Sequence, residues 1–266
     1  MDEAPLEGRV GPLRDLGGGV EIPVLGLGVW QLPDGAATEQ AVEWAFEAGY
    51  RHIDTATFYR NERGVGAALR RSGLPREQVF LTTKWLPLRR GPVAELQRSL
   101  ERLGVEYVDL YLIHWPLPGR VGSGWRAFEQ LQERGLARAI GVSNFSASRL
   151  GRFLGSVRKP PVVNQMHISP LHFTPQLLAY CAAHAIVVEA YSPLERGRAP
   201  RHPLIVALAE RHGRTPAQVA LRWAVQHELV VIPKSGRRER IQENAGIFDF
   251  ALSEEEMRQL DALGSS

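Results

Sequence analysis

Short apolar runs alternate with helical stripes along this chain. Continuous apolar runs indicate buried strands, and apolar residues three or four positions apart indicate helices. We predict strands at residues 24–29, 52–55, 79–83, 108–113, 139–142, 162–164, 186–190 and 229–232. Because these runs are apolar on both faces, they predict a parallel sheet covered by helices. Eight such units favour a closed (β/α)8 TIM barrel, which leaves no edge strand exposed.

Turn and cap residues mark the ends of several elements. Pro92 begins a helix with one apolar face, and Gly104 ends it. Two capping boxes open later helices, one formed by Thr215 with Gln218 and one by Ser253 with Glu256. Residues 9–21 contain three consecutive glycines and predict a β-hairpin, which we expect to close the lower end of the barrel. Two irregular segments that follow strands are predicted to be site loops, at residues 116–124 and 192–203.

Length and charge narrow the class of protein. No internal segment is rich enough in Pro, Gly or Ser to mark a linker, so residues 1–266 are predicted to form one domain. The net charge is only +3, and no stripe of Arg and Lys is interleaved with aromatics, which argues against nucleic-acid binding. Residues 1–11 lack the pattern of a signal peptide, and no apolar stretch is long enough to span a bilayer. We expect a cytoplasmic monomer with no membrane partner.

Cys181 is the only cysteine, which excludes an internal disulfide and fits a reducing compartment. It lies among apolar residues on a predicted helix, so we expect it to be a buried core residue. His167 and His172 have no matching cluster of carboxylates or cysteines. We therefore expect no metal site.

Polar side chains gather where the predicted strands end. Asp54, Lys84 and His114 stand at equal steps of 30 residues, and Tyr59 follows shortly after Asp54. Because the carboxyl ends of barrel strands meet at one mouth, these four side chains are predicted to lie together. The later strands end beside Ser143, Asn144, Asn164, Gln165, Tyr191, Ser192, Lys234 and Ser235. The chain has 29 arginines but only three lysines, and two of these, Lys84 and Lys234, belong to this rim, where a compact ammonium is not replaced by arginine.

Several of these segments together resemble the signatures of the aldo-keto reductases in order and spacing. They are residues 49–56, 59–62, 109–116, 140–145 and 232–235. Residues 237–240 and 248–250 are similar to bacterial members such as 2,5-diketogluconate reductase. One motif alone would be weak, but the register of all of them along nearly the whole chain is a strong signal.

The resemblance implies a barrel that reduces aldehydes or ketones with NADPH. Tyr59 would be the general acid that gives a proton to the carbonyl oxygen. Lys84, held by Asp54, would make the phenol more acidic and stabilise the phenolate. His114 would orient the substrate oxygen. Hydride chemistry would belong to the nicotinamide.

The same resemblance implies a cofactor site and a substrate pocket. Residues matched to nicotinamide binding are Ser143, Asn144, Gln165 and the stacking aromatic Tyr191. Residues matched to the rest of the cofactor are Ser192, Leu194, Lys234, Ser235, Arg240, Glu243 and Asn244, with the cationic ones on the 2′-phosphate. These cations favour NADPH over NADH. Trp30, Phe58 and Trp115 match the lining of the substrate pocket. Residues 64–66 lack the third glycine of a Rossmann loop and are predicted to be helical.

Alternatives remain for each assignment. Asp54 with Lys84 can be a structural ion pair, and Arg237, Arg238 and Arg240 can be a solvated helix face. A cofactor-sensing regulatory subunit with little turnover is a second function. A third possible function is a barrel hydrolase that uses paired carboxylates. The lysine beside Asp54 argues against it.

The chain also departs from the family pattern. Residues 166–169 differ from the usual acidic and aromatic residues, and Trp85 follows Lys84 where an aliphatic residue is common. Glu195 replaces a glycine of the pyrophosphate loop, which predicts a negative charge near phosphate unless Arg196 or Arg198 offsets it. Because the chain ends at Ser266 without a long tail, we expect an open, permissive substrate site.

Overall fold

The computed structural model describes residues 8–88, 90–117 and 119–264. Residues 1–7, which belong to the segment searched for a signal peptide, and Ser266 lie outside these ranges. Within them, eight parallel strands form one sheet in the order β10-β9-β8-β7-β6-β5-β4-β3. The strands are β3 (Leu27–Gly28), β4 (His52–Asp54), β5 (Phe80–Trp85), β6 (Val108–Ile113), β7 (Ala137–Ser143), β8 (Val163–His167), β9 (Val187–Tyr191) and β10 (Val230–Val231).

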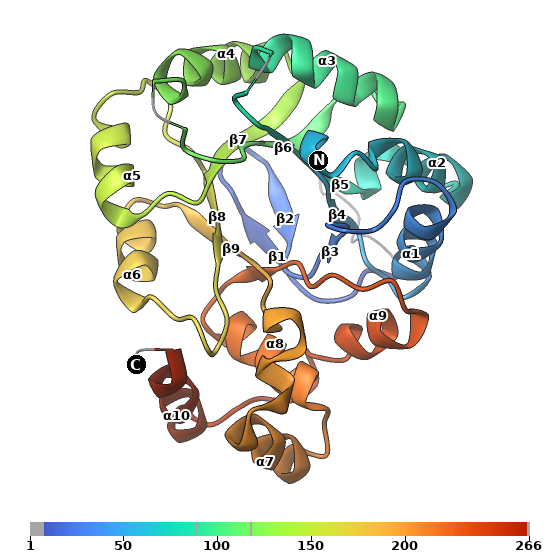
Figure 1. Ribbon diagram of the computed structural model, residues 1–266, viewed down its shortest axis with the longest axis vertical. Coiled ribbons are helices and arrows are strands. Elements are labelled where there is room, and N and C mark those ends of the chain that lie inside the picture. Colours follow the sequence, from blue (N-terminus) through green and yellow to red (C-terminus); the bar gives the residue numbers. More distant parts are fainter. Residues whose placement is uncertain (1–7, 89, 118, 265–266) are drawn as a thin grey trace.

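The sheet closes on itself. Leu25 pairs with Val231, and Gly28 pairs with Lys234, so the first strand segment lies in parallel beside the last. Gly28 is needed at this junction because a Cβ there would lie 2.8 Å from the carbonyl oxygen of Ile232. The predicted (β/α)8 barrel is confirmed (Figure 1).

Helices surround the strands, and α7 and α10 lie beyond this ring, at the bottom of Figure 1. The helices are α1 (Ala36–Glu47), α2 (Glu62–Ser72), α3 (Pro92–Leu103), α4 (Val121–Glu133), α5 (Ala147–Leu154), α6 (Pro175–Ala183), α7 (Pro203–His212), α8 (Pro216–Gln226), α9 (Arg238–Ala245) and α10 (Glu254–Gly264). Short 3₁₀ turns are η1 (Thr57–Tyr59), η2 (Arg76–Gln78), η3 (Glu195–Gly197) and η4 (Ala199–Arg201). No helix within the described ranges has the length and apolarity needed to cross a membrane.

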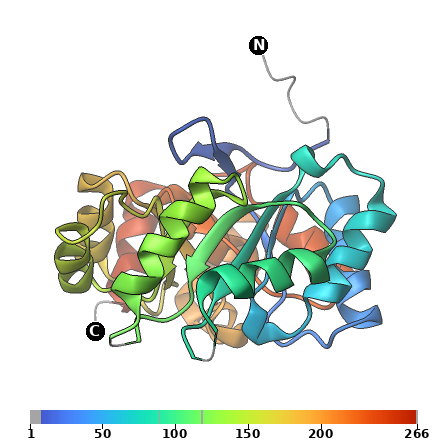
Figure 2. The same cartoon turned by 90° about the horizontal axis from the view of Figure 1, so that it is seen from above.

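The predicted hairpin is present and closes one end of the barrel. Strands β1 (Leu13–Asp15) and β2 (Glu21–Pro23) pair antiparallel around the three glycines, all of which have positive φ. Leu16, Val20 and Ile22 pack in a buried cluster with inward residues of five strands, among them Phe80 and Leu110. Figure 2 shows this hairpin at one edge of the molecule.

The cap predictions are confirmed. Helix α3 begins at Pro92, and Gly104, with φ 69°, donates its N–H to Leu100 to end it. Both capping boxes form, at Thr215 with Gln218 and at Ser253 with Glu256.

Cys181 is fully buried on α6, as expected. The predicted loop 116–124 is wrong in its second half, because α4 begins at Val121 and includes Gly124.

The barrel interior changes from apolar to polar along β5 and β8. Side chains two positions apart point to the same face of a strand. On β5, Phe80 belongs to the apolar cluster above the hairpin, whereas Lys84 on the same face belongs to a polar group. The same change from apolar to polar occurs between Val163 and Gln165, two positions apart on β8. The hairpin end is therefore a packed core, and the opposite end is available for chemistry.

Candidate active site

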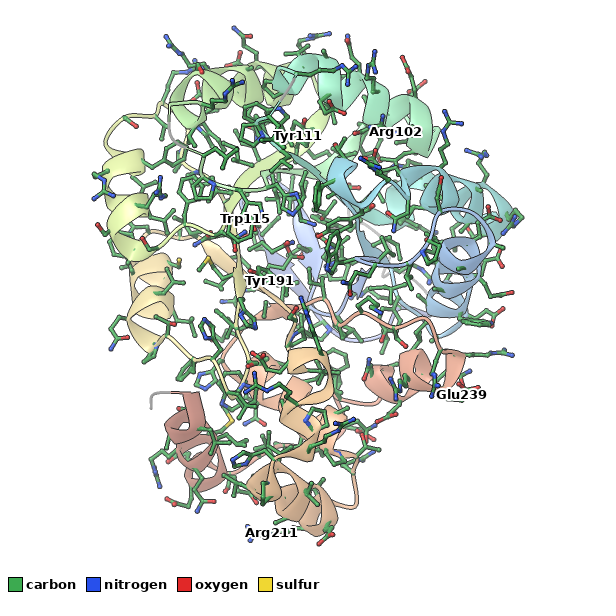
Figure 3. All side chains as sticks on the ribbon, viewed as in Figure 1. Arg102, Tyr111, Trp115, Tyr191, Arg211 and Glu239 are labelled. Carbon is green, nitrogen blue, oxygen red and sulfur yellow. The ribbon has the colours of Figure 1, made fainter. Side chains whose placement is uncertain are left out.

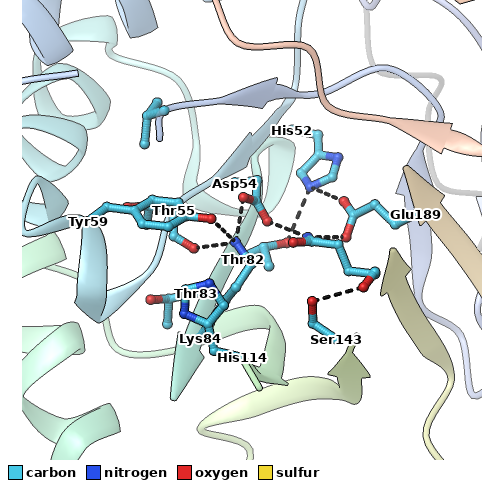
Figure 4. Close-up of polar contacts among 12 residues, drawn as sticks. His52, Asp54, Thr55, Tyr59, Thr82, Thr83, Lys84, His114, Ser143 and Glu189 are labelled. Carbon is cyan, nitrogen blue, oxygen red and sulfur yellow. Dashed lines mark hydrogen bonds and ion pairs between the residues drawn. The ribbon is translucent and has the colours of Figure 1, made fainter. Parts of the chain in front are cut away.

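Asp54, Tyr59 and Lys84 meet at the carboxyl ends of β4 and β5. Lys84 Nζ lies 2.5 Å from Asp54 Oδ1, 2.9 Å from the carbonyl oxygen of Thr55 and 3.2 Å from Tyr59 Oη (Figure 4). Asp54 and Lys84 are buried, with at most 1% exposed. The phenol and the ammonium therefore face one another, as the spacing of the residues predicted.

The turn after β4 holds Tyr59 in this position. Thr57 donates its hydroxyl to the carbonyl oxygen of Lys84, which ties η1 to β5. Asn61 is buried and donates to the carbonyl oxygens of Val29 and Leu32. The segment that carries Tyr59 is thus fixed to the strands on both sides.

Burial and charge oppose one another at these groups. Burial raises the pKa of Tyr59 to about 12, although the neighbouring Lys84 acts to lower it. Burial disfavours the charged amine of Lys84, but Asp54, Tyr59 and Glu189 together outweigh it, and the pKa of Lys84 is raised. The expectation of a more acidic phenol is therefore wrong, because burial raises the pKa of Tyr59 by more than Lys84 lowers it. At neutral pH Tyr59 keeps its proton and Lys84 keeps its charge.

His114 follows β6 and completes the group. Its ring centroid lies 5.6 Å from that of Tyr59 and 6.1 Å from that of Phe58. Burial, with a further contribution from Lys84, lowers the pKa of His114 to about 3. The imidazole is therefore neutral at working pH and can donate or accept a hydrogen bond.

The predicted substrate-pocket aromatics surround this mouth and are exposed. Trp30 is 37% exposed, Phe58 52% and Trp115 46%. The rings of Trp30 and Phe58 stack at 5.6 Å, and Trp30 lies 4.8 Å from the Tyr59 ring. Figure 3 shows Trp115 and Tyr191 over the middle of the barrel. Large apolar rings left exposed beside a buried polar group are typical of a ligand site.

A groove of about 550 Å³ begins at Trp30 and runs between the loop after β9 and helix α9. Predicted cofactor residues that line it are Ser192, Leu194, Lys234, Ser235, Arg240, Glu243 and Asn244. Lys234 and Arg240 are exposed within it. Thr215 donates its hydroxyl to Glu243, which holds α9 against α8.

The predicted nicotinamide residues form hydrogen bonds with one another and with the predicted catalytic residues. Asn144, in a left-handed conformation with φ 66°, accepts from the Tyr191 hydroxyl at 2.9 Å and donates to the carbonyl oxygen of His114 at 3.0 Å. Ser143 donates to the carbonyl oxygen of Gln165. The Gln165 amide nitrogen donates to Asp54 Oδ2 at 2.8 Å. One hydrogen-bonded network therefore joins the two predicted sites.

Glu195 is turned away from the groove. Its Oε1 accepts from the Ser169 hydroxyl at 2.8 Å and lies 2.7 Å from His167 Nε2, while its neighbours Leu194 and Arg196 line the groove. Burial lowers the pKa of His167, although Glu195 acts to raise it. Two departures from the family pattern, at residues 166–169 and at Glu195, therefore contact one another.

Two buried residues next to the predicted catalytic residues, Glu189 and His52, were missed by the sequence analysis. Glu189 on β9 accepts from the Gln165 amide at 2.7 Å, and its Oε1 lies 3.4 Å from His52 Nε2. Both are fully buried. The signal was available, because a glutamate within the otherwise apolar run 186–190 needs a buried partner. Across the described residues, no group of three His, Cys, Asp or Glu side chains could hold a metal ion.

Comparisons with known proteins agree with this geometry. The model of the Aldo/keto reductase family matches residues 24–265. The chain is 48% identical to 9,11-endoperoxide prostaglandin H2 reductase of Trypanosoma cruzi over 92% of this chain and 88% of that protein. It is 44% identical to glyoxal reductase of Bacillus subtilis, over 92% of this chain and 90% of that protein.

Solved structures are similar over the same extent. An aldo/keto reductase of Brucella melitensis superposes with a TM-score of 0.91 at 42% identity, covering 95% of this chain and 99% of that one. A Bombyx mori aldo-keto reductase in complex with NADP superposes with a TM-score of 0.88 at 35% identity, covering 96% of this chain and 93% of that one. The family model and these relatives, together with the barrel fold, show that the chain belongs to the aldo/keto reductase family and is an oxidoreductase that acts on carbonyl groups.

Proposed function

We propose that this protein reduces aldehydes and ketones to alcohols with NADPH, and that Tyr59 is the general acid. The observation that carries the proposal is the contact of 3.2 Å between Tyr59 Oη and Lys84 Nζ at the mouth of the barrel. A neutral phenol is the protonation state that a proton donor requires, and an adjacent ammonium stabilises the phenolate that remains.

The cofactor would supply the hydride, and the protein would supply position and charge. Tyr59 donates its proton to the carbonyl oxygen of the substrate. Lys84, held by Asp54, stabilises the resulting negative charge. His114, neutral in its buried position, donates a hydrogen bond to the same oxygen and orients the carbonyl group.

The groove between the β9 loop and α9 suits the adenosine end of the cofactor. Lys234 and Arg240 place two cations along its lining, which supports a 2′-phosphate and therefore NADPH rather than NADH. Arg240→Ala should weaken binding of NADPH about tenfold or more and leave binding of NADH nearly unchanged, since a charge-assisted hydrogen bond contributes about 1.5–3 kcal/mol.

Substrate range is proposed to be broad. The exposed rings of Trp30, Phe58 and Trp115 border an open mouth and present apolar surface without a dense set of polar contacts. The panel to be tested should include small aldehydes, dicarbonyls, ketones and keto-sugars, the last because of the resemblance to 2,5-diketogluconate reductase. A steep preference for one bulky substrate would argue against an open site. All groups of the proposed site lie within one barrel, which supports a single domain, and we propose that the protein acts as a monomer.

The proposal is tested with Tyr59→Phe, by following NADPH absorbance during turnover and NADPH binding by fluorescence. We expect binding within about twofold of the wild type and turnover reduced by about 10²–10⁴ or more. Undiminished turnover would reject the mechanism. Tight NADPH binding by the wild type without turnover of any carbonyl in the panel would instead favour the regulatory subunit.

A further inference from the structure

Beneath the catalytic group lies a second buried carboxyl group, that of Glu189, which the proposed mechanism does not use. Glu189 Oε2 accepts from Gln165 Nε2 at 2.7 Å, and the same nitrogen donates to Asp54 Oδ2 at 2.8 Å. Figure 4 shows Glu189 and Asp54 on opposite sides of this link. The amide of Gln165 is therefore held between two carboxyl groups.

These two contacts fix which end of the Gln165 amide is free. An amide nitrogen has two hydrogens, and both are donated, one to each carboxyl group. The remaining polar atom is the carbonyl oxygen Oε1, to which no donor of the described residues hydrogen-bonds. Gln165 can then only accept a hydrogen bond from a ligand, so a carboxamide would have to meet it with its NH2 group.

The charges around Glu189 indicate that it carries a proton. From β4, Asp54 and His52 face it, and from β5 the ammonium of Lys84 is the one positive charge in the group. Lys84 contacts Asp54 directly and leaves no second cation for a second buried carboxylate. Burial, followed by the negative charge of Asp54, raises the pKa of Glu189 to about 8.

His52 does not supply the missing positive charge. Burial lowers the pKa of His52 to about 3, so its imidazole is neutral. Its Nε2 lies 3.4 Å from Glu189 Oε1 and 3.2 Å from the Thr82 hydroxyl. A proton on Glu189 Oε1 would therefore point toward a neutral acceptor, while Oε2 continues to accept from Gln165.

We propose that Glu189 is a positioning residue, uncharged in the working enzyme, that fixes the Gln165 amide so that only its carbonyl oxygen is offered to the carboxamide of the bound cofactor. The inference rests on the proposed use of a nicotinamide cofactor, and it extends that proposal to a residue buried below the site. Glu189 acts through Gln165 and touches neither the cofactor nor the substrate.

Two variants separate position from charge. Glu189→Gln keeps the size and the acceptor oxygen but cannot ionise, whereas Glu189→Leu removes the acceptor. We expect Glu189→Gln to bind NADPH within about twofold of the wild type and Glu189→Leu to bind it about tenfold more weakly, as for one lost hydrogen bond. Binding of 2′-phospho-ADP-ribose, which lacks the nicotinamide, should be equal in all three proteins. Equal NADPH affinity in Glu189→Leu and wild type would overturn the positioning role, and equal losses for both ligands would reduce it to a structural one.

The charge state is tested without cofactor, by melting temperature against pH. Between pH 4.5 and about 8 the folded wild type holds a proton that the unfolded chain has released, so its stability falls as pH rises through this window. Glu189→Gln lacks this contribution. We expect the melting temperature of the variant to rise relative to that of the wild type by several degrees from pH 5 to pH 8. If the difference in melting temperature between the two proteins stays constant from pH 5 to pH 8, Glu189 is not uncharged in the fold. This result does not depend on whether NADPH-dependent reduction is confirmed or rejected.

Discussion

Lys84 is a fully buried charge, and its surroundings explain how it is tolerated. Its ammonium has three protons, and the structure supplies three acceptors: Asp54, the carbonyl oxygen of Thr55 and Tyr59. A buried ion pair is weak evidence for stability, because removing charges from water costs about as much as their attraction returns. We therefore expect the pair to serve the proposed chemistry at Tyr59 rather than a structural role alone.

Lys84→Met tests the two explanations against each other. Loss of the ammonium leaves Asp54 as an uncompensated buried carboxylate, which should lower the free energy of unfolding by about 3–5 kcal/mol. Adding Asp54→Asn should recover much of that stability in urea unfolding. Turnover should stay lost in the double variant. Recovery of turnover together with stability would show that the pair is only structural.

At the scale of elements, the absence of a side chain at Gly66 allows α2 to approach α3 closely. The segment 64–66 is helical, as predicted, and a Cβ on Gly66 would lie 2.3 Å from the carbonyl oxygen of Leu103. The glycine is therefore required by helix packing and not by a bound phosphate.

Gly66→Ala should destabilise the fold despite the better helix propensity of alanine. The propensity gain is about 1 kcal/mol, while forcing backbone apart in a packed region costs about 1–3 kcal/mol. Gly122→Ala in α4 is the matched control, since a Cβ there meets nothing within 4 Å. Urea midpoints should fall for the first variant and stay equal or rise for the second. A rise for both would contradict the packing argument.

The loop after β9 is held by Glu195, which has a left-handed φ of 50°. Its contacts with Ser169 and His167 join this groove-lining loop to the segment after β8. Glu195→Ala removes both contacts and should speed NADPH dissociation about tenfold, as for roughly 1–1.5 kcal/mol of lost interaction. Glu195→Gln retains an acceptor for Ser169, so its rate of NADPH dissociation should lie between those of the wild type and Glu195→Ala. Slower dissociation in both variants, measured by stopped-flow fluorescence, would show instead that the charge repels the pyrophosphate.

The elements were predictable to the extent that apolar periodicity reports them. Each predicted run overlaps a strand, but four strands extend beyond the predicted ends: β5 to Trp85, β7 to Ser143, β8 to His167 and β9 to Tyr191. Apolar runs stop where the barrel interior becomes polar, so the apolar pattern does not predict the ends of the strands at the mouth. The pairing of Glu189 with Gln165 and of Glu195 with His167 depends on tertiary contacts between strands and loops, which no local pattern contains.

At the scale of the whole molecule, two buried neutral imidazoles make the fold sensitive to acid. Burial lowers the pKa of His52 and His114 to about 3, whereas in the unfolded chain each titrates near 6.5. Below pH 6.5 the unfolded chain binds more protons, so stability is lost as pH falls, by up to about 1.4 kcal/mol per pH unit for each imidazole.

His114→Gln should therefore lose less stability than the wild type on acidification. The expected difference, from unfolding free energies at pH 6.5 and pH 5, is up to about 1.4 kcal/mol per pH unit. Glu189 opposes the histidines in both proteins and cancels in the comparison. Parallel losses in the two proteins would mean that His114 is protonated in the fold.

The scarcity of lysine gives the whole molecule a simple chemical footprint. Lys84 is sealed inside the barrel, Lys159 lies at the surface near Glu133, and Lys234 is exposed in the groove. An amine-reactive reagent should therefore acetylate Lys159 and Lys234 and spare Lys84. Saturating NADPH should shield Lys234 alone, so that one peptide mass reports nucleotide occupancy while another serves as its internal standard.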